Sequence, residues 1–169
     1  NGISGPYSNG AATTSSPAWP CGAGGNDLWF VYVASAAGTL TADTCTGSNF
    51  DTTLEIFDGT GGCAALVSLG YNDDSCGVQS SVSATVGIGT YYIRVGGFAG
   101  STGNFSLNVN GPVGTGVVAT NTSAGAGCIA AYASFYESFA TSAAFDLANS
   151  SFTMLPTAGG YLMLPGISP

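Results

Sequence analysis

The sequence predicts an all-β fold: an antiparallel, jelly-roll-like β-sandwich followed by a small β-rich C-terminal extension or second domain. Three observations favour it. The chain of 169 residues contains 27 glycines and only 6% charged residues, so turns and neutral polar groups dominate its surface. Its apolar residues recur with a period of two, and turn signals separate the apolar runs roughly every 8–12 residues.

The first 25 residues are expected to form an extended segment. Residues 11–20 (AATTSSPAWP) are small, hydroxylated and interrupted by proline, which indicates an extended approach anchored by Trp19. An extended chain end can pair with a sheet of another molecule, so we treat residues 1–25 as a candidate assembly strand.

Residues 26–111 carry the strand pattern of the sandwich. Leu28–Val33 is apolar at every position, which is typical of a central strand buried on both faces, and Gly38–Asp43 follows after a short turn. The clearest alternation is at 104–109, where Phe105, Leu107 and Val109 face inward. The other predicted half-buried strands lie at 53–57, 81–86 and 90–95.

The motifs of this region resemble a known family. They are Asp27–Phe30, Asp43–Cys45, Phe50–Leu54, Asn72–Gly77, Tyr91–Gly97 and Gly103–Leu107. In order and spacing they are similar to the bacterial pre-peptidase C-terminal (PPC) domain and its cysteine-containing relatives. The resemblance implies a secreted, non-catalytic jelly-roll-like sandwich attached to exported peptidases and cell-surface proteins. Some relatives bind calcium or help to bind polymers.

Beyond Gly111 the composition changes. Residues 112–127 are rich in Gly, Thr and Ala and predict a linker or an edge segment. Residues 128–169 predict a β-rich C-terminal unit that resembles a tail found in large, repetitive secreted bacterial proteins. A unit of this size with a single cysteine buries too little surface to fold alone, so we expect it to need a partner surface.

The composition excludes several function classes. The chain has no histidine, no lysine and one arginine, so Ser-His-Asp, Cys-His and Ser-Lys catalysis and histidine-ligated metals are excluded within it. We therefore predict no catalytic residues and no enzyme activity. A net charge of −8 disfavours nucleic acid, and no apolar run is long enough for a membrane span.

Carboxylates in the loops are candidate calcium ligands. Calcium requires six to eight oxygen ligands, and acidic loops could converge to supply them. The candidates are Asp27, Asp51, Asp58, Asp73 and Asp74. The alternative for residues 72–74 and for Asp51 is a turn in which side-chain oxygens accept local N–H groups.

The lone cation, Arg94, is predicted on the outward face between Ile93 and Val95. There it would pair with a carboxylate, stack on Tyr92 or bind a ligand.

Five cysteines without zinc-site spacing predict disulfides, and hence an extracellular or cell-surface location. Cys45 and Cys76 lie beside motif turns and form the first expected pair. Cys21 and Cys63 form the second, which leaves Cys128 unpaired or bonded outside the chain.

Glycans are a further expectation. N-linked sequons occur at Asn104, Asn121 and Asn149, and O-linked candidates are Thr13, Thr14, Ser15 and Ser16. Aromatic side chains that would stack on sugars if exposed are Trp19, Tyr92 and Phe98, although such residues more often belong to the core.

Two functions remain. The first is a structural subunit that assembles with other copies of itself into a filament or surface layer through terminal strand segments. The second is a calcium- or polysaccharide-binding accessory module of a secreted hydrolase.

Overall fold

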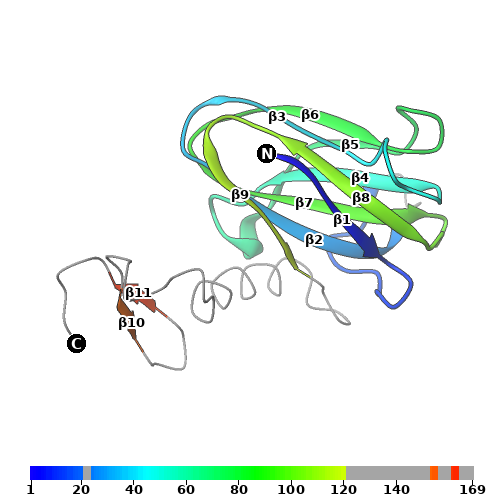
Figure 1. Cartoon of the computed structure of the whole chain (residues 1–169), viewed down its shortest axis with the longest axis horizontal. Coiled ribbons are helices and arrows are strands. Elements are labelled where there is room, and N and C mark those ends of the chain that lie inside the picture. The colour runs from blue at the N-terminus through cyan, green and yellow to red at the C-terminus, as the bar shows by residue number, and fades with distance from the viewer. Residues whose placement is uncertain (21–23, 121–152, 156–160, 164–169) are drawn as a thin grey trace. The chain divides into compact units, whose positions relative to one another are not determined.

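Two antiparallel sheets make up most of the computed structural model, which describes residues 1–20, 24–120, 153–155 and 161–163 (Figure 1). The four-stranded sheet A has the order β1 (Gly2–Ser8), β8 (Asn104–Asn110), β3 (Gly38–Asp43), β6 (Ser81–Val86). The five-stranded sheet B has the order β5 (Val67–Asn72), β4 (Thr52–Asp58), β7 (Gly89–Phe98), β2 (Gly24–Ala34), β9 (Gly114–Thr120). A short 3₁₀ turn, η2 (Cys63–Ala65), precedes β5.

The strand order is that of a jelly roll. Strands β1-β8-β3-β6 form one sheet and β5-β4-β7-β2 the other, which is the arrangement of an eight-stranded double Greek key, and β9 adds a further strand beside β2. The predicted all-β, jelly-roll-like sandwich is therefore confirmed.

The core lies between the sheets, and the alternating pattern determines which side chains reach it. The inward residues of the three central strands of sheet B are Leu28, Phe30, Tyr32, Leu54, Ile56, Tyr91, Ile93 and Val95. They pack against the inward residues of sheet A, which are Leu40, Ala42, Val82, Ala84, Val86, Phe105, Leu107 and Val109. Strand β2 is buried on both faces, as its continuous apolar run predicts, because Trp29 and Val31 are also buried.

The sandwich extends beyond the predicted 26–111. Strand β1, within the segment expected to be a free extended end, pairs antiparallel with β8, from Gly2 opposite Val109 to Ser8 opposite Asn104. Strand β9, within the predicted linker, pairs with β2. Neither segment alternates clearly in sequence, because an edge strand buries few of its own side chains. The chain's first segment is thus part of its own sheet A.

The chain divides into two compact units, Asn1–Ala131 and Tyr132–Pro169. In the second unit the described residues form a hairpin in which β10 (Thr153–Leu155) pairs antiparallel with β11 (Tyr161–Met163). Both strands fall in segments whose sequence indicated β structure. Within the described parts of the chain, no helix has the length and apolar character needed to cross a bilayer.

Candidate functional site

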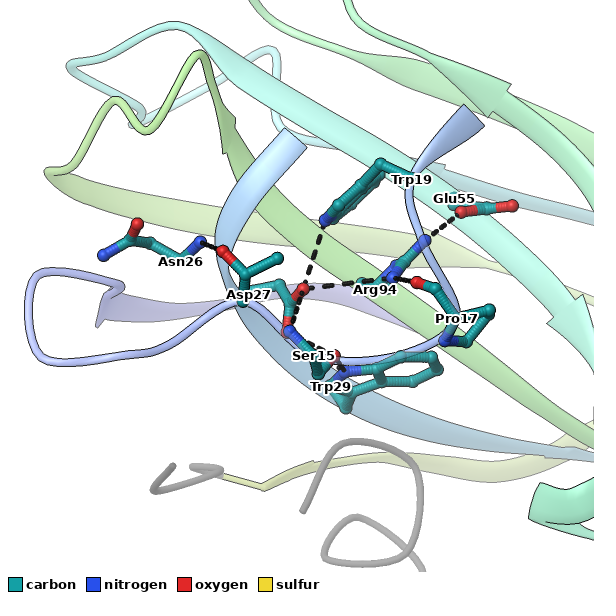
Figure 2. Close-up of polar contacts among 9 residues, drawn as sticks. Ser15, Pro17, Trp19, Asn26, Asp27, Trp29, Glu55 and Arg94 are labelled. Atoms are coloured by element: carbon teal, nitrogen blue, oxygen red, sulfur yellow. Dashed lines mark hydrogen bonds and ion pairs between the residues drawn. The ribbon is translucent and has the colours of Figure 1, made fainter. Parts of the chain in front are cut away.

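The only basic residue lies at the centre of sheet B, on the face turned away from the inter-sheet core. Ile93 and Val95 point into the core, so Arg94 between them points to the opposite face. In the sheet register Arg94 stands directly opposite Trp29 of β2 and Glu55 of β4. Three central strands therefore bring a cation, a carboxylate and an indole side by side (Figure 2).

The guanidinium is held by charged and polar oxygens. Its Nη2 donates to Glu55 Oε2 at 2.5 Å, and its Nη1 donates to the carbonyl of Pro17 at 2.5 Å. Asp27 Oδ2 lies 3.9 Å from Nη1. Arg94, Asp27 and Glu55 are at most 1% exposed, so these charges interact out of water, where pairing matters most.

Aromatic rings enclose the same cation. The Arg94 Cζ lies 3.8 Å from the centroid of the Trp19 ring and 5.3 Å from the centroids of Trp29 and Phe57. A guanidinium stacked on an indole face gains cation–π attraction, which is largest where water is excluded. The sequence placed Arg94 beside Tyr92, but Trp19 from the preceding segment occupies the stacking position.

Residues 9–20, which we call the N-terminal strap, cover this cluster. Asp27 fixes the strap to β2, since its carboxylate accepts hydrogen bonds from Ser15 N at 3.1 Å, Ser15 Oγ at 2.6 Å and Trp19 Nε1 at 3.1 Å. Trp29 Nε1 donates to the same carboxylate at 3.2 Å (Figure 2). The Asp27 carboxylate thus joins strap and sheet.

A β-bulge and two glycines make room for the strap. The register of β2 and β7 shifts between Gly25 and Leu28, and Asn26 in the bulge has a φ of 48°. A Cβ at Gly24 would lie 2.2 Å from the Trp19 ring, and one at Gly96 would lie 2.7 Å from it. Gly24 of β2 and Gly96 of β7 therefore leave the space that the Trp19 ring occupies against the sheet.

The cluster is a closed structural site. Burial lowers the pKa of Arg94, and the hydrogen bond and charge of Glu55, followed by the charge of Asp27, act in the opposite direction. Trp19 and Tyr92, considered as sugar-stacking residues, are only 5% and 1% exposed, whereas Phe98 is 37% exposed. The arrangement can brace strands β2, β4 and β7, and it offers a ligand no access to the Arg94 charge.

A second polar cluster lies where the motif turns meet at the start of β4. Thr44, Thr52 and Ser80 are fully buried, with Thr44 Oγ1 at 2.6 Å from Thr52 Oγ1 and Ser80 N donating to both hydroxyls at 3.1 Å. The Cys45–Cys76 disulfide closes the same pair of turns, with a Cα–Cα distance of 5.7 Å. The predicted first disulfide is confirmed.

Asp51 adjoins this hydroxyl cluster. Burial raises its pKa, as do the neighbouring charges of Asp74 and Asp73. Its Oδ1 is buried and has no hydrogen-bond partner among the described residues. Asp73 Oδ2 accepts a hydrogen bond from Tyr71 OH at 3.2 Å, and Asn72 Oδ1 accepts one from Ser81 N at 3.1 Å, which is the capping role considered for this turn.

The five carboxylates do not converge on one site. In the described part of the chain, no group of three or more acidic, cysteine or histidine side chains lies close enough to hold a metal ion. Asp27 is engaged in the strap, and Asp58 accepts a hydrogen bond from Thr60 N at the far end of β4. A strand of this length separates Asp51 from Asp58 by roughly 20 Å, too far for a shared ion.

The remaining cysteines lie partly outside the described residues. Cys63 is disulfide-bonded. Since Cys45 and Cys76 bond each other and the chain has five cysteines, the partner of Cys63 within the chain is Cys21 or Cys128, both outside the described residues. The Cys21–Cys63 pairing stays a prediction.

The glycan candidates differ in accessibility. Asn104 is exposed at the start of β8, and Thr13, Thr14 and Ser16 are exposed on the strap. Ser15 is buried, and both its backbone N–H and its hydroxyl donate hydrogen bonds to Asp27. Asn121 and Asn149 lie outside the described residues.

The class of this chain is defined by its own structure, which is a jelly-roll sandwich with a closed Arg94 cluster. No family model, no curated protein and no solved structure matches it.

Proposed function

We propose that this chain is a non-catalytic structural subunit of an extracellular assembly built from copies of itself. The supporting observation is its division into a complete sandwich and a separate unit whose described part is a hairpin of three-residue strands. A two-stranded hairpin is at best marginally stable in water by itself, so strands of this kind gain stability by packing on a further surface. We propose that a neighbouring copy of the chain supplies that surface.

The construction of the sandwich suits this role. The motif turns are joined by the Cys45–Cys76 disulfide, and the N-terminal strap is pinned by Asp27 and Arg94. Disulfides persist in oxidising environments, so this bond supports an extracellular location. The exported, non-catalytic character implied by the PPC resemblance agrees with the same proposal.

The full chain, purified under oxidising conditions, tests the proposal. We expect light scattering coupled to size exclusion to give a mass that rises with protein concentration, and electron microscopy to show regular filaments or layers. A mass equal to one 16.6 kDa chain at every concentration, with no ordered particles, would refute it.

A second candidate is the calcium- or polysaccharide-binding accessory module. The specific observation is Asp51, whose buried Oδ1 has no hydrogen-bond partner among the described residues while Asp73 and Asp74 lie near it. A calcium ion would supply the missing partner and offset the like charges. Asp51 would supply one carboxylate ligand, and backbone carbonyls and water would have to complete the coordination sphere, because no three described carboxylates gather around one point.

Thermal unfolding in calcium separates the two candidates. If calcium binds at Asp51, millimolar calcium should raise the Tm, and Asp51→Asn should abolish the rise. The matched control is Asp58→Asn, which removes a carboxylate from the far end of the same strand and should retain the rise. The same Tm for wild type with and without calcium, together with no retention on polysaccharide, would exclude the accessory function.

A further inference from the structure

The structure carries an unprotected sheet edge that fits the second unit of another copy. We propose that the outer edge of β6 is the acceptor for the β10–β11 hairpin of a neighbouring chain, which adds to sheet A by strand pairing. This inference rests on the proposed assembly and names the two surfaces that would make it.

The direction of the β6 backbone groups is fixed by their hydrogen bonds. Ser80 O accepts from Thr44 N, next to β3. Ser81 N donates instead to Asn72 Oδ1, and Ser81 O accepts from Ser75 Oγ, so both backbone groups of Ser81 point away from β3. Because these directions alternate along a strand, the N–H and C=O groups of Ser83 and Thr85 also point away from β3.

Among the described strands, β6 is the last strand of sheet A, and β5 and β4, which lie near it across the sandwich, pair with each other and not with it. The close approach of Thr41 Oγ1 and Ser83 Oγ, 2.8 Å apart, agrees with this assignment, because side chains lie closer in a pair that exchanges no backbone hydrogen bonds. Ser83 and Thr85 thus present a short row of open donors and acceptors.

The other edges are less suited to a new strand. The β1 edge contains Pro6, and its register with β8 shifts between Ser4 and Tyr7. The β5 edge has a shifted register with β4, and the β9 edge has a shifted register with β2 between Val31 and Val33. In contrast, β6 pairs with β3 at all six positions without a shift and has neither a charge nor a proline. Charges, prolines and bulges are the devices that block edge pairing, and β6 has none of them.

The β10–β11 hairpin has the properties that pairing with the β6 edge requires. Thr153–Leu155 and Tyr161–Met163 contain no charge and no proline, and pairing with each other leaves one backbone edge of each strand outward. A strand of three residues matches the short open run on β6, which begins only after Asn72 has capped Ser81. The two partners are therefore matched in length and in the absence of charge.

Donor and acceptor are different surfaces of the same chain. A contact between unlike surfaces leaves a free donor on one molecule and a free acceptor on the other, so it propagates into an open filament unless its rotation closes a ring. The arrangement thus predicts linear growth of the assembly.

The test uses proline in the full chain. Ser83→Pro removes an outward N–H and leaves the hydrogen bonds of β6 to β3 in place, so it should weaken association about tenfold or more. The matched control, Ser83→Ala, removes the hydroxyl and keeps the N–H, and should assemble as wild type does. A donor variant, Met154→Pro/Leu162→Pro, should also fail to assemble alone.

Mixing the variants provides the decisive measurement. Ser83→Pro retains its donor and the hairpin variant retains its acceptor, so an equimolar mixture should form discrete dimers by light scattering. Pairing between two β6 edges would instead let the hairpin variant form dimers by itself, before mixing, and would overturn the inference. If Ser83→Pro fails to fold, amide hydrogen exchange of the wild type decides instead. The Ser83 and Thr85 amides should be open in the monomer and protected in the assembly, and protection already present in the monomer would contradict the proposal.

The failures can be told apart. If the wild-type chain remains monomeric, both the proposed function and this inference are refuted. If the wild type and Ser83→Pro assemble equally well, only the assignment of β6 as the acceptor is refuted, and the proposed structural function is unaffected.

Discussion

At the scale of single residues, Arg94 is a buried charge that depends on several partners. Its guanidinium neutralises Glu55, approaches Asp27 and binds the Pro17 carbonyl while stacking on Trp19. The charged groups are fully buried, so removing one would leave the others unpaired in a region without water. Arg94 therefore stabilises the fold chiefly because, without it, buried carboxylates would have no charged partner.

We expect Arg94→Met to lower the free energy of unfolding by about 3–5 kcal/mol, because the buried Glu55 side chain would lose its charged partner. Denaturant unfolding measures this change. In the double variant Arg94→Met/Glu55→Gln part of the loss should be recovered, since the orphaned charge is gone. Equal and additive losses would show that the two side chains do not interact.

The second residue-scale prediction concerns Asp51 and pH. Burial raises its pKa above 3.8, and Asp74 and Asp73 act in the same direction, so the folded state binds this proton more tightly than the unfolded state does. Ionised Asp51 therefore destabilises the fold at pH values above its folded pKa. This penalty disappears as the pH falls below the unfolded value of about 3.9.

In calcium-free buffer, Asp51→Asn should accordingly have a higher Tm than wild type at pH 7 and the same Tm near pH 3. Circular dichroism melts at both pH values provide the measurement. For comparison, Asp58→Asn keeps a side-chain oxygen that can accept from the Thr60 N–H and removes only the charge, so it should show no such gain. A lower Tm for Asp51→Asn at pH 7 would contradict the assigned direction.

At the scale of elements, regular alternation made the core strands predictable. The inward sets of β6, β7 and β8 follow from period-two spacing alone, and the continuous apolar run of β2 indicated burial on both faces. Strands β1, β5 and β9 were not predicted, because edge strands expose many of their side chains and their sequences do not alternate cleanly.

The Arg94 cluster was only partly predictable. Spacing placed Arg94 opposite the core and favoured a carboxylate partner, which Glu55 and Asp27 provide. The strap that covers it could not be inferred, since the contact between Trp19 and Arg94 joins residues far apart in the chain. The sequence did contain one indication of this contact. Ser15 and Asp27 each lie within four residues of a tryptophan, and polar residues so close to large aromatic ones suggest a buried polar network.

Packing of the strap on the sheet predicts a clear response at Gly96. An added Cβ there would lie 2.7 Å from Trp19 and 2.8 Å from the Gly25 carbonyl, so backbone as well as side chain must shift. Gly96→Ala should therefore destabilise the fold by about 1–3 kcal/mol and alter tryptophan fluorescence. Gly87→Ala, where no atom lies within 4 Å of the added Cβ, should be close to neutral. Equal effects would argue against strap packing.

At the scale of the whole molecule, charge opposes self-association. Nine carboxylates and one arginine give a net charge of −8, so copies repel each other wherever this charge is unscreened. The proposed contact between β6 and the hairpin contains no charged residue of its own. Its strength should depend on backbone hydrogen bonds, and the approach of two copies should depend on salt.

Assembly is therefore expected to increase with ionic strength. Screening shortens the range of the repulsion from about 30 Å at 0.01 M salt to about 10 Å at 0.1 M. Light scattering of the full chain across this range should show a growing assembled fraction. A decrease with added salt would indicate that ion pairs hold the copies together instead.

The pairing of β1 with β8 also determines when this protein can fold. Gly2 lies opposite Val109, and the Asn1 side chain exchanges hydrogen bonds with Gly111. The first strand of sheet A thus has no partner until the chain beyond residue 109 is available. Contacts of such high sequence separation slow folding, and they keep a partly synthesised chain from closing its sandwich. A chain that ends before β8 should therefore leave β1 unpaired and sheet A incomplete.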